Sequence, residues 1–370
     1  MAKSPQPLSP QPLAPAFTLL QRWLDEGLTP GVAAVVARDG RLLGEFYSGS
    51  ADRERPVEAG TPFCLASITK LYTAAAALAL IQDGLLALDE SLAELLPELA
   101  EEDRAQLTLR RLLTHTSGLP LDLGPEEQER IGPTPSLEAI LDQYARLRPV
   151  VPPGSQVRYS NMNYGLLARV VERAGGEPFG AFLRRRILDP LGLTQTSLPP
   201  PPDIWDRLAR VADTDEPGAE HESFNSTWWR GLGLPYGGAT APAREVARFL
   251  TACLSERAVP GFLTPPTLEL MTHSHTGELS GGVPGFSSWA RADWGLGPEL
   301  RGEKRLHPFG DLTSPETFGH LGLSGTMAWA DPDSGLVCVV LTNRLLTKDT
   351  ARRLVAFCRF SNAVAGSLPE

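Results

Sequence analysis

The sequence is short of cysteine, with four in 370 residues. Cys64, Cys253, Cys338 and Cys358 are scattered along the chain, and no Cys-x-x-Cys pair occurs. This pattern excludes the usual zinc-ligand spacing and the disulfide framework of a small secreted protein. We therefore expect buried free thiols, no metal and no cofactor. Cys64 lies close to Ser67, but no base is spaced to activate it, so we do not assign it a catalytic role.

Long apolar runs and basic clusters are also missing. No uncharged apolar segment reaches the roughly 20 residues that a membrane-spanning helix needs. The formal net charge is −10 and the isoelectric point is near 5.2, which argues against nucleic acid or an anionic membrane as a partner. Residues 1–15 are rich in proline and carry no apolar stretch, so we expect a disordered arm rather than a signal peptide. The predicted location is the cytoplasm.

Lysine is scarce as well, with four lysines against thirty arginines. One of the four, Lys70, follows Ser67 by three positions. Residues three apart on a helix face the same way, with Cβ atoms about 5–6 Å apart. A buried lysine, unlike arginine, can lose its proton and act as a base toward a serine hydroxyl. The pair therefore predicts a nucleophile, Ser67, with an adjacent base.

The segment after this pair is typical of a buried helix. Residues 68–81 are mostly strong helix formers, and no charge follows Lys70 until Asp83. Asp83-Gly84 supplies a stop signal. Ser67 then lies at the helix N-terminus, where the dipole favours developing negative charge. The alternative is a core helix with a capping serine, but a lysine in the first turn of a buried helix needs a partner or a chemical role.

Both ends of the chain show pairs of apolar runs joined by turns that contain Asp and Gly, a pattern that predicts β-hairpins. The runs are 32–37 with 42–48 and 326–330 with 336–342, and helices are expected over 16–26 and 350–363. The predicted fold class is α+β, an antiparallel sheet from both termini flanked by helices with an inserted mainly helical region. Residues 16–70 and 305–366 would form the sheet region and 71–304 the helical region, with the active site between the two.

Two further clusters could complete a site around Ser67. Tyr159 and Asn161 precede a helix that we expect to begin near Tyr164; a tyrosine can relay a proton, and an asparagine can hold a carbonyl group. His320 and Gly322 lie just before the C-terminal hairpin, where glycines let a backbone approach a ligand. Read alone, the first cluster is also compatible with a helix cap and the second with a strand entry.

Together the three clusters resemble the motifs of the serine β-lactamase and penicillin-binding-protein superfamily, in the class C-like branch that includes the family VIII carboxylesterases. Ser67 and Lys70 fit the Ser-x-x-Lys motif. The second motif has the form Tyr-x-Asn and the third the form His-x-Gly. Residues 112–119, 236–238, 245–249 and 341–344 also resemble the family, so the resemblance covers roughly residues 16–365. It implies a β-lactamase/transpeptidase-like fold.

The resemblance also implies an acyl-enzyme mechanism on Ser67. Lys70 and Tyr159 would move the proton, and which of them is the general base stays open. Asn161 would position the acyl side of the substrate. The backbone N–H groups of Ser67 and of Leu323, which follows Gly322, would stabilise the oxyanion. His320 would lie beside the substrate.

The expected substrate is a small ester, amide or β-lactam. β-Lactams and D-Ala-D-Ala peptides carry a carboxylate, for which a lysine in the third motif is a permanent cation. His320 is mostly neutral near pH 7 unless its pKa is raised. These features favour hydrolysis of carboxylic esters. The alternatives are β-lactamase, D-alanyl-D-alanine carboxypeptidase or D-aminopeptidase activity at the same site, and a non-catalytic binding or scaffold protein with the same fold. The sequence leaves the oligomeric state open.

Overall fold

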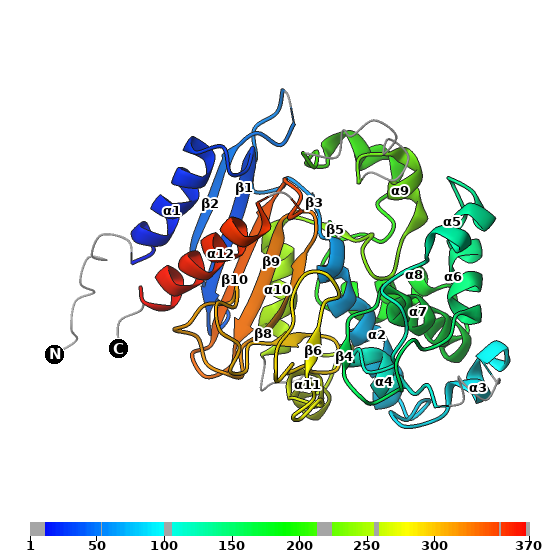
Figure 1. Cartoon of the computed structure of the whole chain (residues 1–370). Helices are drawn as coiled ribbons and strands as arrows, with labels where there is room; N and C mark the ends of the chain where they lie inside the picture. The colour runs from blue at the N-terminus through cyan, green and yellow to red at the C-terminus, as the bar shows by residue number, and fades with distance from the viewer. Residues whose placement is uncertain are drawn as a thin grey trace.

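A six-stranded antiparallel sheet joins the two ends of the chain (Figure 1). Its strand order is β2-β1-β10-β9-β8-β7, and β1 pairs directly with β10. The computed structural model describes residues 12–52, 54–99, 106–212, 224–254, 259–347 and 349–367, so most of the predicted Pro-rich arm lies outside the described residues. The strands are β1 Gly31–Arg38, β2 Arg41–Gly49, β7 Glu299–Leu300, β8 Phe318–Gly322, β9 Thr326–Asp331 and β10 Leu336–Thr342. The predicted α+β class is confirmed.

Helices cover both faces of this sheet. The N-terminal helix α1 (Ala14–Asp25) and the C-terminal helix α12 (Thr350–Ala365) pack on the outer face, and α10 (Ala243–Cys253) contacts β1, β9 and β10 on the inner face (Figure 1). Alternate residues of β1 belong to the two cores: Val32 and Val36 to the outer one, Ala33 and Val35 to the inner one. Burial on both faces explains why the central strands β1 and β10 are nearly continuous apolar runs.

The predicted N-terminal hairpin is confirmed, and the backbone of its turn explains why Asp39-Gly40 predicts a hairpin. Asp39 and Gly40 both have positive φ, at 49° and 74°. A two-residue turn with this backbone matches the twist of the flanking strands, and Asp-Gly tolerates it. The helices expected at the two ends are present, with bounds shifted by one or two residues.

The inner face of the sheet adjoins a helical region arranged around α2 (Thr69–Gln82), which is buried along most of its length. Two short ladders connect segments of the region, β3 (Phe63–Cys64) with β5 (Thr240–Ala241) and β4 (Val157–Arg158) with β6 (Gly281–Gly282). The other helices are α3 Leu92–Leu95, α4 Leu109–Leu113, α5 Pro125–Ile131, α6 Leu137–Arg146, α7 Asn161–Gly175, α8 Phe179–Leu183, α9 Thr227–Leu232 and α11 Pro265–Thr272, with short 3₁₀ or π turns at Ala66–Ile68, Pro97–Leu99, Arg184–Leu188 and Pro202–Arg207.

Two elements from residues 71–304 belong to the sheet or pack directly on it. Both β7 and α10 come from residues 71–304, yet β7 extends the sheet and α10 packs against it. The division into a 16–70/305–366 unit and a 71–304 unit stays a prediction. None of the helices that the structure describes combines the length and apolar character needed to cross a membrane.

Candidate active site

Ser67 lies in a 3₁₀ turn, Ala66–Ile68, immediately before α2. The residue before it, Ala66, has a φ of 46°, a left-handed conformation that costs energy for a residue with a Cβ. Such strain at the residue preceding a nucleophile is typical of a functional turn. The helix predicted over 68–81 is confirmed as Thr69–Gln82. Lys70 is in its first turn, with Nζ 3.2 Å from Ser67 Oγ.

The amine of Lys70 has two fixed hydrogen-bond acceptors in addition to its contact with Ser67. Nζ donates to Asn161 Oδ1 at 2.8 Å and to the backbone carbonyl of Tyr236 at 2.9 Å. A neutral amine has two N–H groups and one lone pair, so these two bonds leave the lone pair directed at Ser67 Oγ. Burial lowers the pKa of Lys70 well below its usual value, and the Asp122 carboxylate opposes this only in part. The environment therefore favours a neutral amine that accepts a proton from Ser67.

Tyr159 follows β4 and is held from both sides. Its backbone N–H donates to Gly282 at 2.9 Å, and its ring stacks on that of His115 at a centroid distance of 4.4 Å. Lys70 Nζ lies 4.8 Å from the centre of the Tyr159 ring. Burial raises the pKa of Tyr159, although a hydrogen bond with Ser67 acts in the opposite direction. Tyr159 therefore stays a protonated phenol beside Ser67.

The helix expected near Tyr164 begins three residues earlier, at Asn161. Ser160 is its N-cap but makes no capping bond; its Oγ donates instead to the carbonyl of Pro120 at 2.5 Å. The N–H of Asn161 is satisfied by the carbonyl of Leu121, so the helix can start without a side-chain cap. This earlier start puts Asn161 in the first turn, where it reaches Lys70.

The third motif is held against the nucleophile turn. A Cβ at Gly322 would collide with Thr326 Oγ1 and with the carbonyl of Leu65, so only glycine fits. Thr326 Oγ1 donates to that carbonyl at 3.0 Å, and Ser324 Oγ donates to the carbonyl of Cys64 at 2.7 Å. The intervening residue Leu323 therefore sits next to the Ser67 turn, and its oxyanion role stays a prediction.

His320 is buried, and its ring packs against Tyr159 and Trp294 at centroid distances of 5.8 and 6.1 Å. Burial, helped by Lys70, lowers the pKa of His320 to about 4, so the imidazole is neutral at pH 7. His320 is not among the described residues that line the cavity beside Ser67. Its place beside the substrate stays a prediction.

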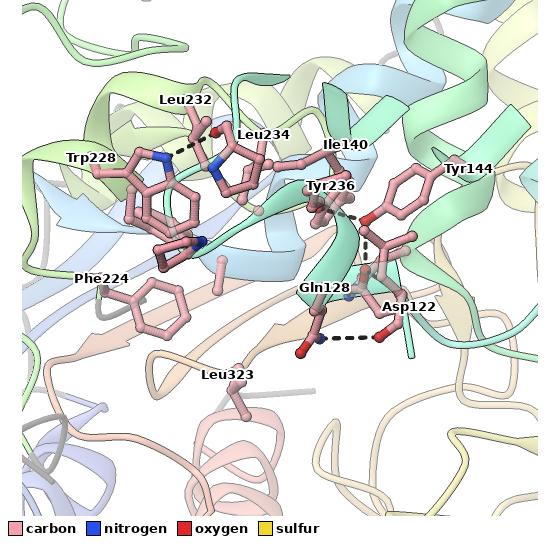
Figure 2. A pocket seen from close by; sticks show the side chains of 18 of the residues that line it. Asp122, Gln128, Ile140, Tyr144, Phe224, Trp228, Leu232, Leu234, Tyr236 and Leu323 are labelled. Carbon is pink, nitrogen blue, oxygen red and sulfur yellow. Dashed lines mark hydrogen bonds between the residues drawn. The ribbon is translucent and has the colours of Figure 1, made fainter. Parts of the chain in front are cut away.

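A cavity of about 430 Å³ opens beside Ser67, within the usual range for small-molecule sites. Phe224 and Trp228 lie on one side of it and Asp122 and Tyr144 on the opposite side (Figure 2). Its other walls are mostly apolar, and the residues that complete them include Leu123, Ile131, Ile140, Trp229, Leu232, Leu234 and Leu323. Among the described residues that line the cavity, Asp122 carries the only charge.

Three of the polar residues here were not assigned a role from the sequence, namely Asp122, Tyr144 and Tyr236. Tyr236 begins one of the stretches that resemble the family, and Asp122 follows another by three residues. Nothing in the sequence marks Tyr144. The Trp228-Trp229 pair, which reads equally well as packing or as cleft wall, proves to line the cavity.

Comparisons with known proteins identify the family and agree with the fold. The model of the family described as Beta-lactamase matches residues 20–357. Esterase EstB of Burkholderia gladioli is 32% identical, over 85% of this chain and 86% of its own length. Penicillin-binding protein 4 of Amycolatopsis lactamdurans is 30% identical, over 85% of this chain and 81% of its own. A penicillin-binding protein homologue from Caulobacter crescentus superposes with a TM-score of 0.79 at 24% identity, over 98% of this chain and 99% of that one.

Proposed function

The chain belongs to the β-lactamase family, and from that premise we propose that it is a serine hydrolase that cleaves carboxylic esters through an acyl-enzyme on Ser67. Ser67 Oγ attacks the ester carbonyl and its proton passes to Lys70 Nζ. The tetrahedral intermediate collapses, the C–O bond to the alcohol breaks, and Tyr159 donates a proton to the leaving oxygen. Water then attacks the acyl carbon and gives a proton to Lys70, the bond from that carbon to Ser67 Oγ breaks, and Oγ takes up the proton, which releases the acid and free Ser67.

We assign the base role to Lys70 rather than to Tyr159. Support comes from the hydrogen bonds of Lys70 Nζ, which occupy two N–H groups and leave its lone pair facing Ser67. Burial acts in the same sense, because it lowers the pKa of Lys70 and raises that of Tyr159. A protonated Tyr159 suits proton donation to the leaving group, with Lys70 as the group that resupplies it. The N–H groups of Ser67 and Leu323 would bind the oxyanion.

The observation that carries the ester assignment is the charge of the cavity. Its described walls are largely aromatic and aliphatic, and the one charge on them is the negative Asp122. The family's β-lactam and D-Ala-D-Ala substrates are anions, and a carboxylate in the wall opposes them. A neutral ester meets no such penalty and gains from the apolar walls.

Asp122 also favours a second candidate substrate class. An amide or ester of an amino acid with a free ammonium group would be attracted by the same carboxylate. Hydrolysis of such amides fits the site better than hydrolysis of a peptide with a C-terminal carboxylate.

The test is a panel of p-nitrophenyl butyrate, a D-amino-acid amide and nitrocefin, measured as kcat/KM. We expect the ester to be the best substrate and nitrocefin the poorest. A fluorophosphonate probe should label the wild type, and Ser67→Ala should lose both the covalent adduct and the pre-steady-state burst. A wild type that binds substrates without being labelled is a scaffold protein, and a preference for nitrocefin over the ester contradicts the assignment. The cytoplasmic location stays a prediction that cell fractionation would test.

A further inference from the structure

Lys70 belongs to a closed set of hydrogen bonds, which we call the Lys70 network: Lys70, Asn161, Asp122, Tyr144 and Tyr236. Asn161 Oδ1 accepts from Lys70, and Asn161 Nδ2 donates to Asp122 Oδ2 at 3.0 Å. The hydroxyl of Tyr144 lies 2.6 Å from Asp122 Oδ1 and 2.7 Å from the hydroxyl of Tyr236. The backbone carbonyl of Tyr236 then accepts from Lys70 and closes the set. Figure 2 shows Asp122, Tyr144 and Tyr236 together at one end of the cavity.

From this geometry we propose that Asp122 is a positioning residue, which fixes the side-chain amide of Asn161 and thereby directs the amine lone pair of Lys70 at Ser67. The inference rests on the proposed function, because it concerns the base of that reaction. It assigns Asp122 no contact with the reacting atoms.

The orientation of the Asn161 amide decides whether the lone pair of Lys70 is available to Ser67. An ionised carboxylate has no proton to donate, so only Nδ2 of Asn161 can face Asp122. Oδ1 must then face Lys70, where it takes up one of the two N–H groups of the amine. If the amide were turned round, Nδ2 would face Lys70 and would donate to the lone pair. The lone pair would then no longer be available to Ser67.

The remaining contacts of Asp122 hold the carboxylate in place. Since Tyr144 has a single hydroxyl proton, it donates to Asp122 and accepts from Tyr236. The N–H of Leu123 also donates to Asp122 Oδ1, at 2.9 Å. Three of the roughly four acceptor positions of the carboxylate are thus occupied by protein groups. A carboxylate placed chiefly to bind a substrate cation would leave more of its oxygens free toward the cavity.

The charge of Asp122 gives the proposal a pH signature. Several polar or titratable groups face or act on Lys70. They are the hydroxyl of Ser67, the rings of Tyr159, Tyr164 and Tyr236, the amide of Asn161, the imidazoles of His115 and His320, and the carboxylate of Asp122. Burial lowers the pKa of Lys70, and the negative charge of Asp122 raises it. Removing the carboxylate therefore lowers the pKa of Lys70 further, so the neutral base persists to lower pH.

The decisive variant is Asp122→Asn, assayed with p-nitrophenyl butyrate. The side-chain amide introduced by this exchange can donate as well as accept, so Asn161 is free to turn. We expect kcat to fall on the order of tenfold to a hundredfold, the loss that follows from a hydrogen bond to a charged group. KM should change little, and the acid limb of the kcat/KM profile should move to lower pH. Asp122→Glu keeps the charge, so its acid limb should return toward the wild-type position.

Asp142→Asn is the matched control. Asp142 is on α6, two residues before Tyr144, and is paired with Arg169 on the neighbouring helix. Losing this half-exposed carboxylate should leave kcat and the acid limb unchanged. Should Asp122→Asn fail to fold, Tyr144→Phe removes one support of Asp122 without removing a charge. It should lower kcat with KM and the acid limb unchanged.

A rise in KM with kcat and the acid limb unmoved would show that Asp122 binds substrate instead, and would overturn the proposal. So would an unchanged kcat in Tyr144→Phe. Labelling of Ser67 by a fluorophosphonate separates this proposal from the function itself. If the wild type is labelled and Asp122→Asn behaves like it, the role of Asp122 alone is wrong; if the wild type is not labelled, both proposals are wrong.

Discussion

Two lysines lie in the described part of the chain, and both are buried, but their surroundings differ. Lys304 Nζ contacts a carboxylate directly, Glu299 Oε1 at 3.1 Å, and donates to the carbonyls of Asp293 and Leu300 at 2.9 and 2.6 Å. The two hydrogen-bond acceptors of Lys70 are neutral oxygens, and Asp122 is linked to it through Asn161.

The charge of the groups that contact each buried lysine therefore decides whether its amine is held as a cation or can be neutral. Burial lowers the pKa of both, but at Lys304 the contacting carboxylate of Glu299 opposes the shift. At Glu299 itself burial raises the pKa, yet the charge of Lys304 and the contact with His307 outweigh this effect and hold the pKa below its usual range. Lys304 is thus half of an ion pair within the structure, whereas the surroundings of Lys70 suit the base role that we propose for it.

Replacing Lys70 by arginine should have the largest effect, because it removes the feature that distinguishes Lys70 from Lys304, an amine able to lose its proton. Arginine keeps the positive charge but cannot lose its proton, having a pKa above about 12. We expect Lys70→Arg to lose turnover by a factor of about 100 or more, which is the usual contribution of a general base, with the fold largely intact. Steady-state kinetics with p-nitrophenyl butyrate and circular dichroism are the measurements.

Lys304→Arg is the matched control, because it makes the same exchange at the other buried lysine. It should retain wild-type turnover per folded molecule. Loss of the base should leave about 1% of wild-type turnover or less. If Lys70→Arg kept more than about 5%, Lys70 would be an electrostatic partner only and the base role would move to Tyr159.

Lys304→Met should act on stability instead of chemistry. It leaves Glu299 charged and buried without its lysine partner, which costs about 3–5 kcal/mol of the free energy of unfolding. Urea denaturation measures the loss. The double variant Lys304→Met/Glu299→Gln should recover part of it, since the uncompensated charge is gone. A double variant as unstable as the sum of the two single ones would mean that the two side chains are not coupled.

The acid side of the stability profile should also depend on Glu299. Because its pKa is lower in the folded than in the unfolded chain, its stabilising contribution is fully present above about 4.3, the usual glutamate value, and is lost as the pH falls through the folded pKa. The difference in unfolding free energy between wild type and Glu299→Gln should therefore shrink as the pH is lowered from 7 to 3. A difference that stays constant over this range contradicts the prediction.

His320→Lys would add a third buried lysine to the part of the chain that the structure describes. A charge-assisted hydrogen bond to a substrate carboxylate is worth roughly 1.5–3 kcal/mol, so the ratio of kcat/KM for nitrocefin over p-nitrophenyl butyrate should rise about tenfold. The ratio is compared with wild type at one pH slightly above neutral. A flat or falling ratio in a folded variant that still labels at Ser67 would show that His320 does not face the substrate.

The sequence predicted those features that depend on neighbouring residues. The helical spacing of Ser67 and Lys70 and the Asp39-Gly40 turn are local, and each is enough to place its element. Burial of the helix after Lys70 also follows from its own composition. These predictions needed no knowledge of distant contacts.

The features that the sequence did not reveal depend on segments that meet only in the folded chain. Asp122, Tyr144 and Tyr236 come from three separate stretches, and no periodicity links them. The burial of His320 results from Tyr159 and Trp294, which lie on other segments. The start of α7 was misplaced because a carbonyl elsewhere in the chain, that of Leu121, satisfies the N–H of Asn161.

The pairing of β1 with β10 has a consequence for how the protein is made. Val32 lies opposite Thr342, and the N–H of Gly31 donates to the Asn343 side chain, 312 residues away. At about 5–20 residues per second, a ribosome needs roughly 15–60 s to supply the partner of the first strand. During this time the N-terminal hairpin has an open apolar edge and an unfilled outer face. Synthesis slowed near the C-terminus should therefore lengthen the period of chaperone binding and lower the yield of folded enzyme.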